Sequence, residues 1–172
     1  MLVAGMTRGL LVVLLLAAAL WDIRKRRIPN PLNAAVLLAG LLDTVLGGGW
    51  LSALSALGAS FLTVALFWIP WRKGMLGGGD VKLAGAAAAS VGLPLLHEYL
   101  LATALAGAVV ALVCFFMSNR SARQEMVTNL KMATAGVLPR PPLRGGGGRI
   151  SVPYGVACAA AALLVAFVRK GW

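Results

Sequence analysis

Six apolar runs dominate the sequence, and each is long enough, or nearly so, to cross a lipid bilayer as a helix. A hydrocarbon core about 30 Å thick needs roughly 20 apolar residues in a helix, and fewer where the helix is short or its neighbours thin the membrane. The runs are residues 2–21, 31–46, 51–68, 83–96, 99–117 and 152–168. With 60% hydrophobic and 12% charged residues, the chain is too apolar for a soluble domain. We therefore expect an all-α polytopic membrane protein with about six transmembrane helices, in a single domain over residues 1–172.

The basic residues predict how the runs are oriented. Sixteen Lys and Arg stand against five acids, which gives a formal net charge of +11. Thirteen of the sixteen lie in the connections after the first, third and fifth runs, and such basic connections stay on the cytoplasmic side of the membrane. Both termini are then expected to be periplasmic. Because the basic residues cluster between apolar runs and do not form a stripe, we expect no nucleic-acid partner.

Two segments allow a second interpretation. Residues 10–16, followed by three alanines, have the pattern of a cleaved signal peptide, but the four basic residues after the first run favour a retained span. The connection at about 118–150 is expected to be a cytoplasmic loop, and the prolines and glycines of its second part, residues 139–148, predict a flexible linker. Its first part spaces four apolar residues by four, three and four, which favours a helix lying in the membrane interface, with a plain solvated basic loop as the alternative. These residues are Met126, Leu130, Ala133 and Val137.

Two of the five acids lie where an acid is costly and therefore usually functional, at the membrane edge. Asp22 directly follows the first run and Asp80 directly precedes the fourth, so the topology puts both on the cytoplasmic side at similar depth. Two carboxylates brought together can share one proton, so that one acts as a base toward water and the other as an acid toward the substrate. That is the chemistry of an aspartic protease. Asp43 is expected near the outer end of the second span, and Glu98 with His97 in a wet periplasmic turn.

The residues around each aspartate suggest helix starts. Three glycines, residues 77–79, precede Asp80 and permit close backbone approach, and we expect Asp80 to be the N-cap of the helix that follows. After Asp22, Asn30 and Pro31 predict the N-cap and first residue of the next helix, with Asn33 one turn later facing the same membrane edge. A capped helix behind a basic cluster explains the asparagines but offers no reason for an acid at Asp22.

These motifs resemble those of the type IV prepilin peptidases, which are GxGD membrane aspartic peptidases, and in particular the short form that serves Flp pili of the tight-adherence system. Residues 22–33 and 77–80 carry the resemblance, and Pro153-Tyr154-Gly155 adds weakly to it. It implies a hydrolase that removes the leader peptide from prepilins at the cytoplasmic face of the bacterial inner membrane during pilus assembly. Its catalytic pair would be Asp22 and Asp80. The residues expected to shape the site are Gly77, Gly79, Lys82, Pro29, Asn30, Asn33, Tyr154 and Gly155.

We expect no metal and no other cofactor in this chain, because it lacks the cysteine pairs of larger relatives. Larger members of that family carry an N-terminal cytoplasmic domain whose cysteine pairs bind zinc, and they also methylate the new pilin N-terminus. Here the two cysteines, Cys114 and Cys158, lie in apolar runs without CxxC spacing, and we expect buried free thiols. We do not assign a methyltransferase activity. The expected partners are a prepilin-like protein and the lipid bilayer, and a homodimer is left open.

Several assignments stay open from the sequence alone. The field of a helix N-terminus would make Asp80 the base, whereas the basic residues 24–27 favour an ionised Asp22, so the roles of base and acid are not assigned. Lys82 could guide an acidic residue of the substrate or simply obey the positive-inside rule. The alternative functions are a presenilin-like intramembrane protease, a transporter using paired acids, and a non-catalytic pilus-assembly protein.

Overall fold

The computed structural model describes residues 2–73, 76–134 and 153–170, and in these residues the regular secondary structure is entirely helical, which confirms the all-α prediction. The elements are α1 (Leu2–Lys25), α2 (Asn30–Arg72), α3 (Gly78–Val91), the short 3-10 turn η1 (Leu93–Leu95), α4 (Leu96–Met117), α5 (Arg120–Thr134) and α6 (Tyr154–Lys170). Three stretches, Gly5–Lys25, Asn30–Arg72 and Leu93–Met117, are long and apolar enough to cross a membrane. The chain is therefore a membrane protein with several apolar helices, while the number of six spans and the periplasmic termini stay predictions.

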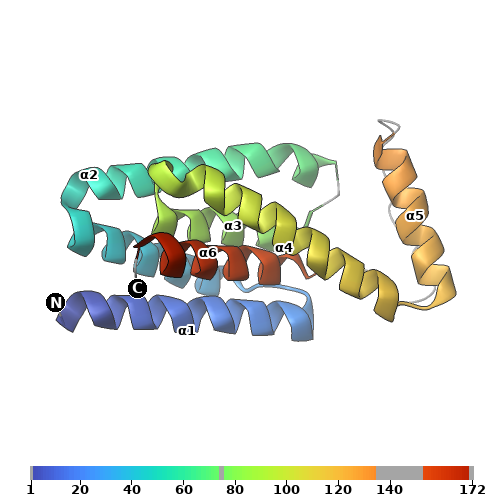
Figure 1. Cartoon of the computed structure of the whole chain (residues 1–172), viewed down its shortest axis with the longest axis horizontal. Coiled ribbons are helices and arrows are strands. Elements are labelled where there is room, and N and C mark those ends of the chain that lie inside the picture. The colour runs from blue at the N-terminus through green and yellow to red at the C-terminus, as the bar shows by residue number, and fades with distance from the viewer. Residues whose placement is uncertain (1, 74–75, 135–152, 171–172) are drawn as a thin grey trace.

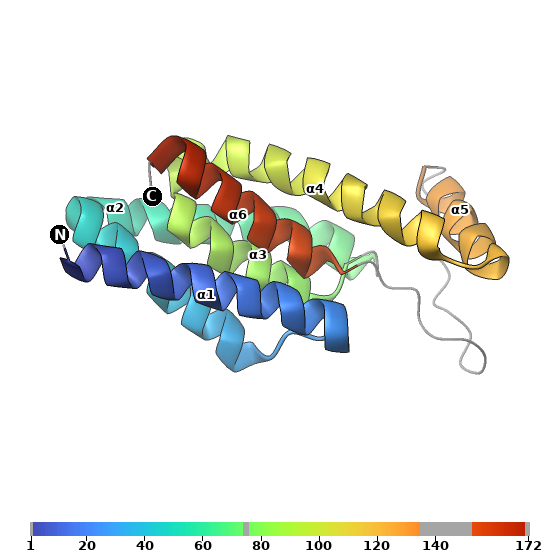
Figure 2. The same cartoon turned by 60° about the horizontal axis from the view of Figure 1, so that its bottom comes forward.

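The helix α2 folds back on itself. A straight helix of 43 residues would be about 65 Å long, roughly twice the hydrocarbon thickness of a bilayer. Gly49 breaks it with a φ of 72° and a ψ of −166°, a conformation that glycine adopts without steric cost. Figures 1 and 2 show that the chain runs in opposite directions before and after this point. The two arms, called here the first leg (residues 30–48) and the second leg (residues 50–72), contain the second and third predicted runs.

The helix α3 is the centre of the bundle. It packs against α2 and α6, and its residues from Leu83 to Val91 are all buried. Small side chains permit close packing: a Cβ on Gly85 would lie 2.5 Å from Cγ2 of Val64. The prediction that this run packs tightly among other helices is confirmed. Its predicted bounds were wrong, however, because the three residues before Val81 already form the first turn and because Gly92, with a φ of 80°, ends the helix.

The helix α5 lies beyond one end of the bundle, connected through α4 (Figure 1). Arg123 fixes the junction, since its Nε donates to the carbonyl of Phe115 at 2.9 Å and its Nη2 to that of Phe116 at 2.6 Å. These carbonyls belong to the last turn of α4, where the backbone lacks helical partners. A plain loop was thus the wrong alternative for residues 120–134. A position in the membrane interface stays a prediction, and Val137 and the Pro/Gly-rich linker lie outside the described residues.

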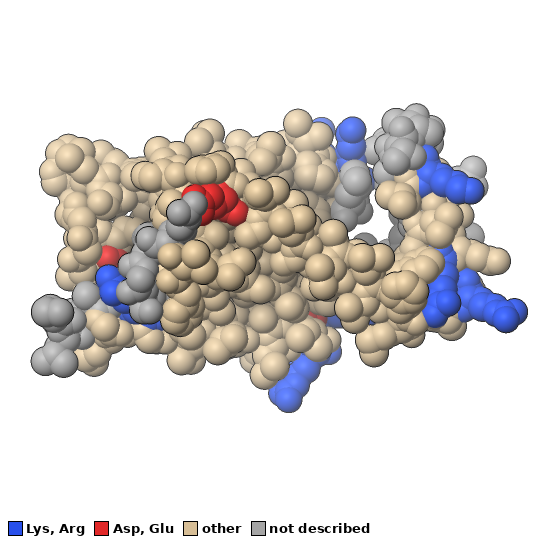
Figure 3. Space-filling model, viewed as in Figure 1, with Lys and Arg blue, Asp and Glu red and all other residues tan. Residues whose placement is uncertain are grey.

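Charge is sparse on the flank of the bundle seen in Figure 3, and Lys and Arg gather mainly around α5.

Asp43 was expected to be interfacial, but it is only 4% exposed, and its Oδ1 accepts a hydrogen bond from Arg8 Nε at 3.3 Å. The pair joins α1 to the first leg of α2. Glu98 lies in the first turn of α4, and its Oε1 is 3.9 Å from His97 Nε2.

The Arg8–Asp43 pair gives a stability prediction. Arg8→Gln leaves the buried Asp43 carboxylate without its cation and should lower the free energy of unfolding by about 2–3 kcal/mol. Breaking a fully buried pair costs roughly 3–5 kcal/mol. We expect a smaller loss here because the Arg8 side chain is 38% exposed. Thermal unfolding in detergent measures the loss. Adding Asp43→Asn should recover part of it, since the stranded charge is then removed. An Arg8→Gln protein as stable as the wild type would contradict this role.

Candidate active site

Asp22 lies within α1, near the C-terminal end of the helix, and does not follow it. The helix α1 continues past Trp21 to Lys25, and the Asp22 side chain, 4% exposed, faces the start of α6. The backbone N–H of Gly155 donates to Asp22 Oδ2 at 2.8 Å. Gly155 is the second residue of α6, where backbone N–H groups have no helical acceptor, and this end of a helix favours a negative charge. The first turn of α6 therefore holds the Asp22 carboxylate in place.

Asp80 occupies the third position of α3, so the prediction that it is the N-cap was wrong. The helix begins at Gly78, and the N-cap is Gly77. The Asp80 N–H donates to the Gly77 carbonyl at 3.1 Å, and the Gly77 N–H donates back to Asp80 Oδ2 at 3.3 Å. This reciprocal pair resembles a capping box in which glycine, having no side chain, contributes backbone atoms only. The exchange fixes the Asp80 carboxyl at the start of α3.

The two carboxyl groups lie within electrostatic reach of each other. Asp80 precedes the apolar part of α3, and burial, with the nearby charge of Asp22 as a second cause, raises its pKa to about 6. Hydrogen bonds from the N–H groups of Gly77 and Gly155 lower the pKa but do not offset these effects. The Gly155 peptide thus acts on both carboxyl groups. An Asp80 that keeps its proton beside an Asp22 held by an N–H donor can supply both an acid and a base.

At two positions, neighbouring side chains lie so close to the backbone that only glycine fits. A Cβ on Gly155 would lie 2.8 Å from Asp22 Oδ2 and 2.7 Å from Cδ1 of Ile28, and a Cβ on Gly77 would lie 2.8 Å from Asp80 Oδ2. A Cβ on Gly79 would meet Ile28 N at 3.5 Å, an ordinary contact. Among the expected glycines, Gly77 and Gly155 are therefore more tightly constrained than Gly79.

Ile28, which contacts both Gly79 and Gly155, was not among the residues predicted from the sequence. The sequence feature that could have indicated it is an apolar residue directly after four basic ones.

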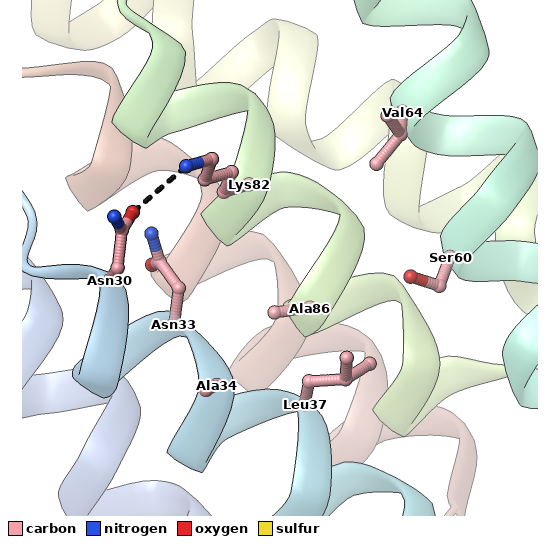
Figure 4. A pocket seen from close by; sticks show the side chains of 8 residues that line it. All are labelled: Asn30, Asn33, Ala34, Leu37, Ser60, Val64, Lys82 and Ala86. Atoms are coloured by element: carbon pink, nitrogen blue, oxygen red, sulfur yellow. Dashed lines mark hydrogen bonds between the residues drawn. The ribbon is translucent and has the colours of Figure 1, made fainter.

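The asparagines support the start of α3 from the side of α2. Asn33 is 5% exposed, and its Nδ2 donates to the Gly79 carbonyl at 3.5 Å. Asn30 was expected to be the N-cap of α2, but Pro29 has that position, with an extended ψ of 139° and a carbonyl that accepts the first helical hydrogen bonds. The Asn30 side chain instead accepts a hydrogen bond from Lys82 Nζ at 2.9 Å, as Figure 4 shows.

The remaining expected residue, Tyr154, packs between helices at the start of α6. Its ring centroid is 6.2 Å from that of Phe67, and a Cβ on Gly107 would lie 2.6 Å from Tyr154 Cε2. It thereby fixes the start of α6 between α2 and α4.

Within the described residues, no three His, Cys, Asp or Glu side chains form a group that could hold a metal ion. Cys158 is buried and Cys114 is partly exposed, and both are free thiols.

Comparison with known proteins gives one match. The sequence model of the type IV leader peptidase family matches residues 9–112, which include Asp22 and Asp80. The match ends before α5 and α6, so the contact of Gly155 with Asp22 comes from the structure alone. No curated protein and no solved structure is significantly similar to the chain.

Proposed function

Because this chain belongs to the type IV leader peptidase family, and is therefore an aspartic leader peptidase, we propose that Asp22 and Asp80 are its catalytic pair. The observation that supports this pair is the Gly155 N–H, which binds Asp22 at 2.8 Å and also acts on Asp80. Asp22 is held by the start of α6 and Asp80 by the start of α3, and the charge of Asp22 acts on Asp80. The same membrane end carries the basic residues 24–27: Arg24 and Lys25 belong to the last turn of α1, and Arg26 and Arg27 follow it.

In the proposed mechanism Asp22 is the base and Asp80 the acid. Asp22 takes a proton from a water molecule, and the water oxygen bonds to the carbonyl carbon of the scissile peptide. Asp80 gives its proton to the departing nitrogen as the C–N bond breaks, which leaves a new carboxyl end and a new amine. The Gly155 N–H at 2.8 Å favours the charged form of Asp22, and repulsion by that charge favours a protonated Asp80. Burial and the charge of Asp22 thereby outweigh the helix-terminus field, which alone would favour Asp80 as the base.

The proposed substrate is a prepilin of the Flp type, cut after the glycine that ends its short basic leader at the cytoplasmic face of the inner membrane. The apolar helices and the position of both aspartates at a basic membrane end are consistent with a cut at the surface. Six spans are proposed, one for each apolar run of the sequence, so that Asp22 and Asp80 lie at the edges of the first and the fourth. Both termini would then be periplasmic, and α5 would lie in or at the cytoplasmic interface.

Co-expression with a Flp-type prepilin tests the substrate assignment. The full chain should shorten the precursor by the length of its leader, seen as a gel shift, and mass spectrometry of the product should place the new N-terminus after the glycine. Replacing that glycine of the precursor by valine is the matched control and should block the cut. Processing of another type IV prepilin with the Flp precursor left intact would overturn the Flp assignment while leaving the peptidase in place.

The alternative functions make different demands on the pair. Membership of a leader peptidase family argues against a transporter and against a non-catalytic assembly protein. A presenilin-like enzyme cuts within the bilayer and needs an aspartate deep in a span. Asp22 does lie inside α1, yet only three residues before its end at Lys25. Cleavage at the membrane surface therefore fits the position of Asp22 better.

The pKa of Asp80 predicts a pH dependence. The pair is active when it holds one proton, and a raised pKa means that Asp80 keeps this proton up to about pH 6 and loses it as the pH rises further. The value of kcat/KM should therefore fall with increasing pH above about 6, approaching tenfold per pH unit. Initial rates on a detergent-solubilised prepilin from about pH 5 to about pH 8 measure it. A rate that rises through this range would contradict Asp80 as the acid.

A further inference from the structure

A groove separate from the aspartate pair opens between the two legs of α2 and over α3 (Figure 4). Its volume is about 320 Å³. Polar side chains lie at the end where the first leg and α3 begin: Asn30, Asn33 and Lys82. Further along, the lining is mainly apolar, with Leu37, Val64 and Ala86 beside the single hydroxyl of Ser60. The groove therefore has a polar end and an apolar body.

The groove lies on the other side of α3 from the catalytic carboxyl. Lys82 and Ala86 are four residues apart and share one face of the helix, whereas Asp80, two residues before Lys82, is rotated by about 200°. Asn33 connects the two regions, because it lines the groove while its Nδ2 donates to the carbonyl of Gly79, next to Asp80. A molecule in the groove would thus contact the support of the site without touching the reacting atoms.

The charge at the polar end is not balanced by an acid among the described residues. Lys82 is exposed, and its ammonium donates to the neutral Asn30 amide at 2.9 Å. An ammonium has three N–H donors, so others remain for an anion. The polar end therefore suits an anionic group.

The size of the groove decides what the apolar body can hold. From Asn30 to Leu37 the first leg advances seven residues, about 10 Å, which reaches from a headgroup into the hydrocarbon layer. A thin, flexible acyl chain fits this space.

We propose that the groove binds an anionic phospholipid, with its phosphate at Lys82 and one acyl chain along Leu37, Val64 and Ala86. Basic pockets between transmembrane helices on the cytoplasmic side bind anionic headgroups in this way, and the charge and the apolar body fit the two parts of one molecule. The lipid would bridge the two legs of α2 and support Asn33 from behind. This inference does not depend on the peptidase function.

Native mass spectrometry of the full chain in detergent tests it, with phosphatidylglycerol and phosphatidylcholine of equal chain length added in turn. The wild type should retain phosphatidylglycerol preferentially. Lys82→Gln should lower this preference about fivefold. Lys73→Gln, which removes another exposed charge outside the groove, should leave it unchanged. Val64→Trp, which fills the apolar body, should reduce the retention of both lipids.

Several results would overturn the lipid assignment. One is an unchanged preference in Lys82→Gln, and another is an equal loss in Lys73→Gln, which would indicate general attraction to a basic surface. Thermal unfolding is a second measurement. Phosphatidylglycerol should raise the midpoint temperature of unfolding of the wild type, and inorganic phosphate should not. Equal stabilisation by inorganic phosphate would mean that the groove binds an anion at its polar end and no acyl chain, which contradicts the lipid assignment. Crosslinking of a prepilin at Leu37 would assign the groove to the substrate instead.

Discussion

Asp80→Asn is expected to abolish leader processing, with kcat/KM falling by about 10²–10⁴-fold. The amide has nearly the shape of the carboxyl group and can keep a contact with the Gly77 N–H, but it cannot give a proton to the departing nitrogen. Asp22→Asn should cause a loss of the same order, because water then has no base. Co-expression with the precursor, followed by a gel shift, gives the qualitative result, and single-turnover rates in detergent give the magnitude.

The control for these substitutions is another acid-to-amide change. Glu98→Gln, at the start of α4 beside His97, should process the precursor at the wild-type rate. Because each single substitution removes a group that acts as part of a unit, Asp22→Asn combined with Asp80→Asn should be hardly worse than either alone. Processing that survives Asp80→Asn, at an equal level of folded protein, would remove the pair from the mechanism.

The broad architecture could be predicted from local patterns. Apolar runs and basic connections are properties of contiguous sequence. They predicted the helices, and the separate runs at residues 31–46 and 51–68 predicted the reversal within α2. The approach of Asp22 and Asp80 followed from the same reasoning, since both lie at ends of runs on one side. Their catalytic role stays a prediction until the variants are measured.

The contacts that fix the site could not be predicted in the same way. Gly155 and Asp22 are 133 residues apart, and only packing of α1, α3 and α6 brings them together. The helix starts also differ from the prediction, because the Pro29 carbonyl and the Gly77 backbone take the capping roles that composition assigned to Asn30 and Asp80. Side-chain preference identifies a helix end to within a few residues, and tertiary contacts then decide which residue caps it.

Gly155→Ala is the second substitution with a large expected effect. The new Cβ would lie 2.8 Å from Asp22 Oδ2 and 2.7 Å from Ile28 Cδ1, both well inside the usual contact distance of about 3.5–4.0 Å. The carboxylate must then move by a fraction of an ångström or more, and such a displacement of a reacting group costs about 10²-fold in rate. The loss should fall on kcat and leave KM nearly unchanged, because Gly155 positions Asp22 and does not bind substrate. Steady-state rates on solubilised prepilin measure both constants.

A folding defect is a weak explanation for such a loss, since alanine is a better helix former than glycine. Gly9→Ala in α1, where a Cβ meets nothing within 4 Å, is the matched control and should retain wild-type activity. Combining Gly155→Ala with Ile28→Val removes one of the two collisions, so a small recovery is expected while the contact with Asp22 remains. Full recovery in the double variant would mean that Ile28 alone transmits the effect, and wild-type activity in Gly155→Ala would show that the peptide of α6 does not position Asp22.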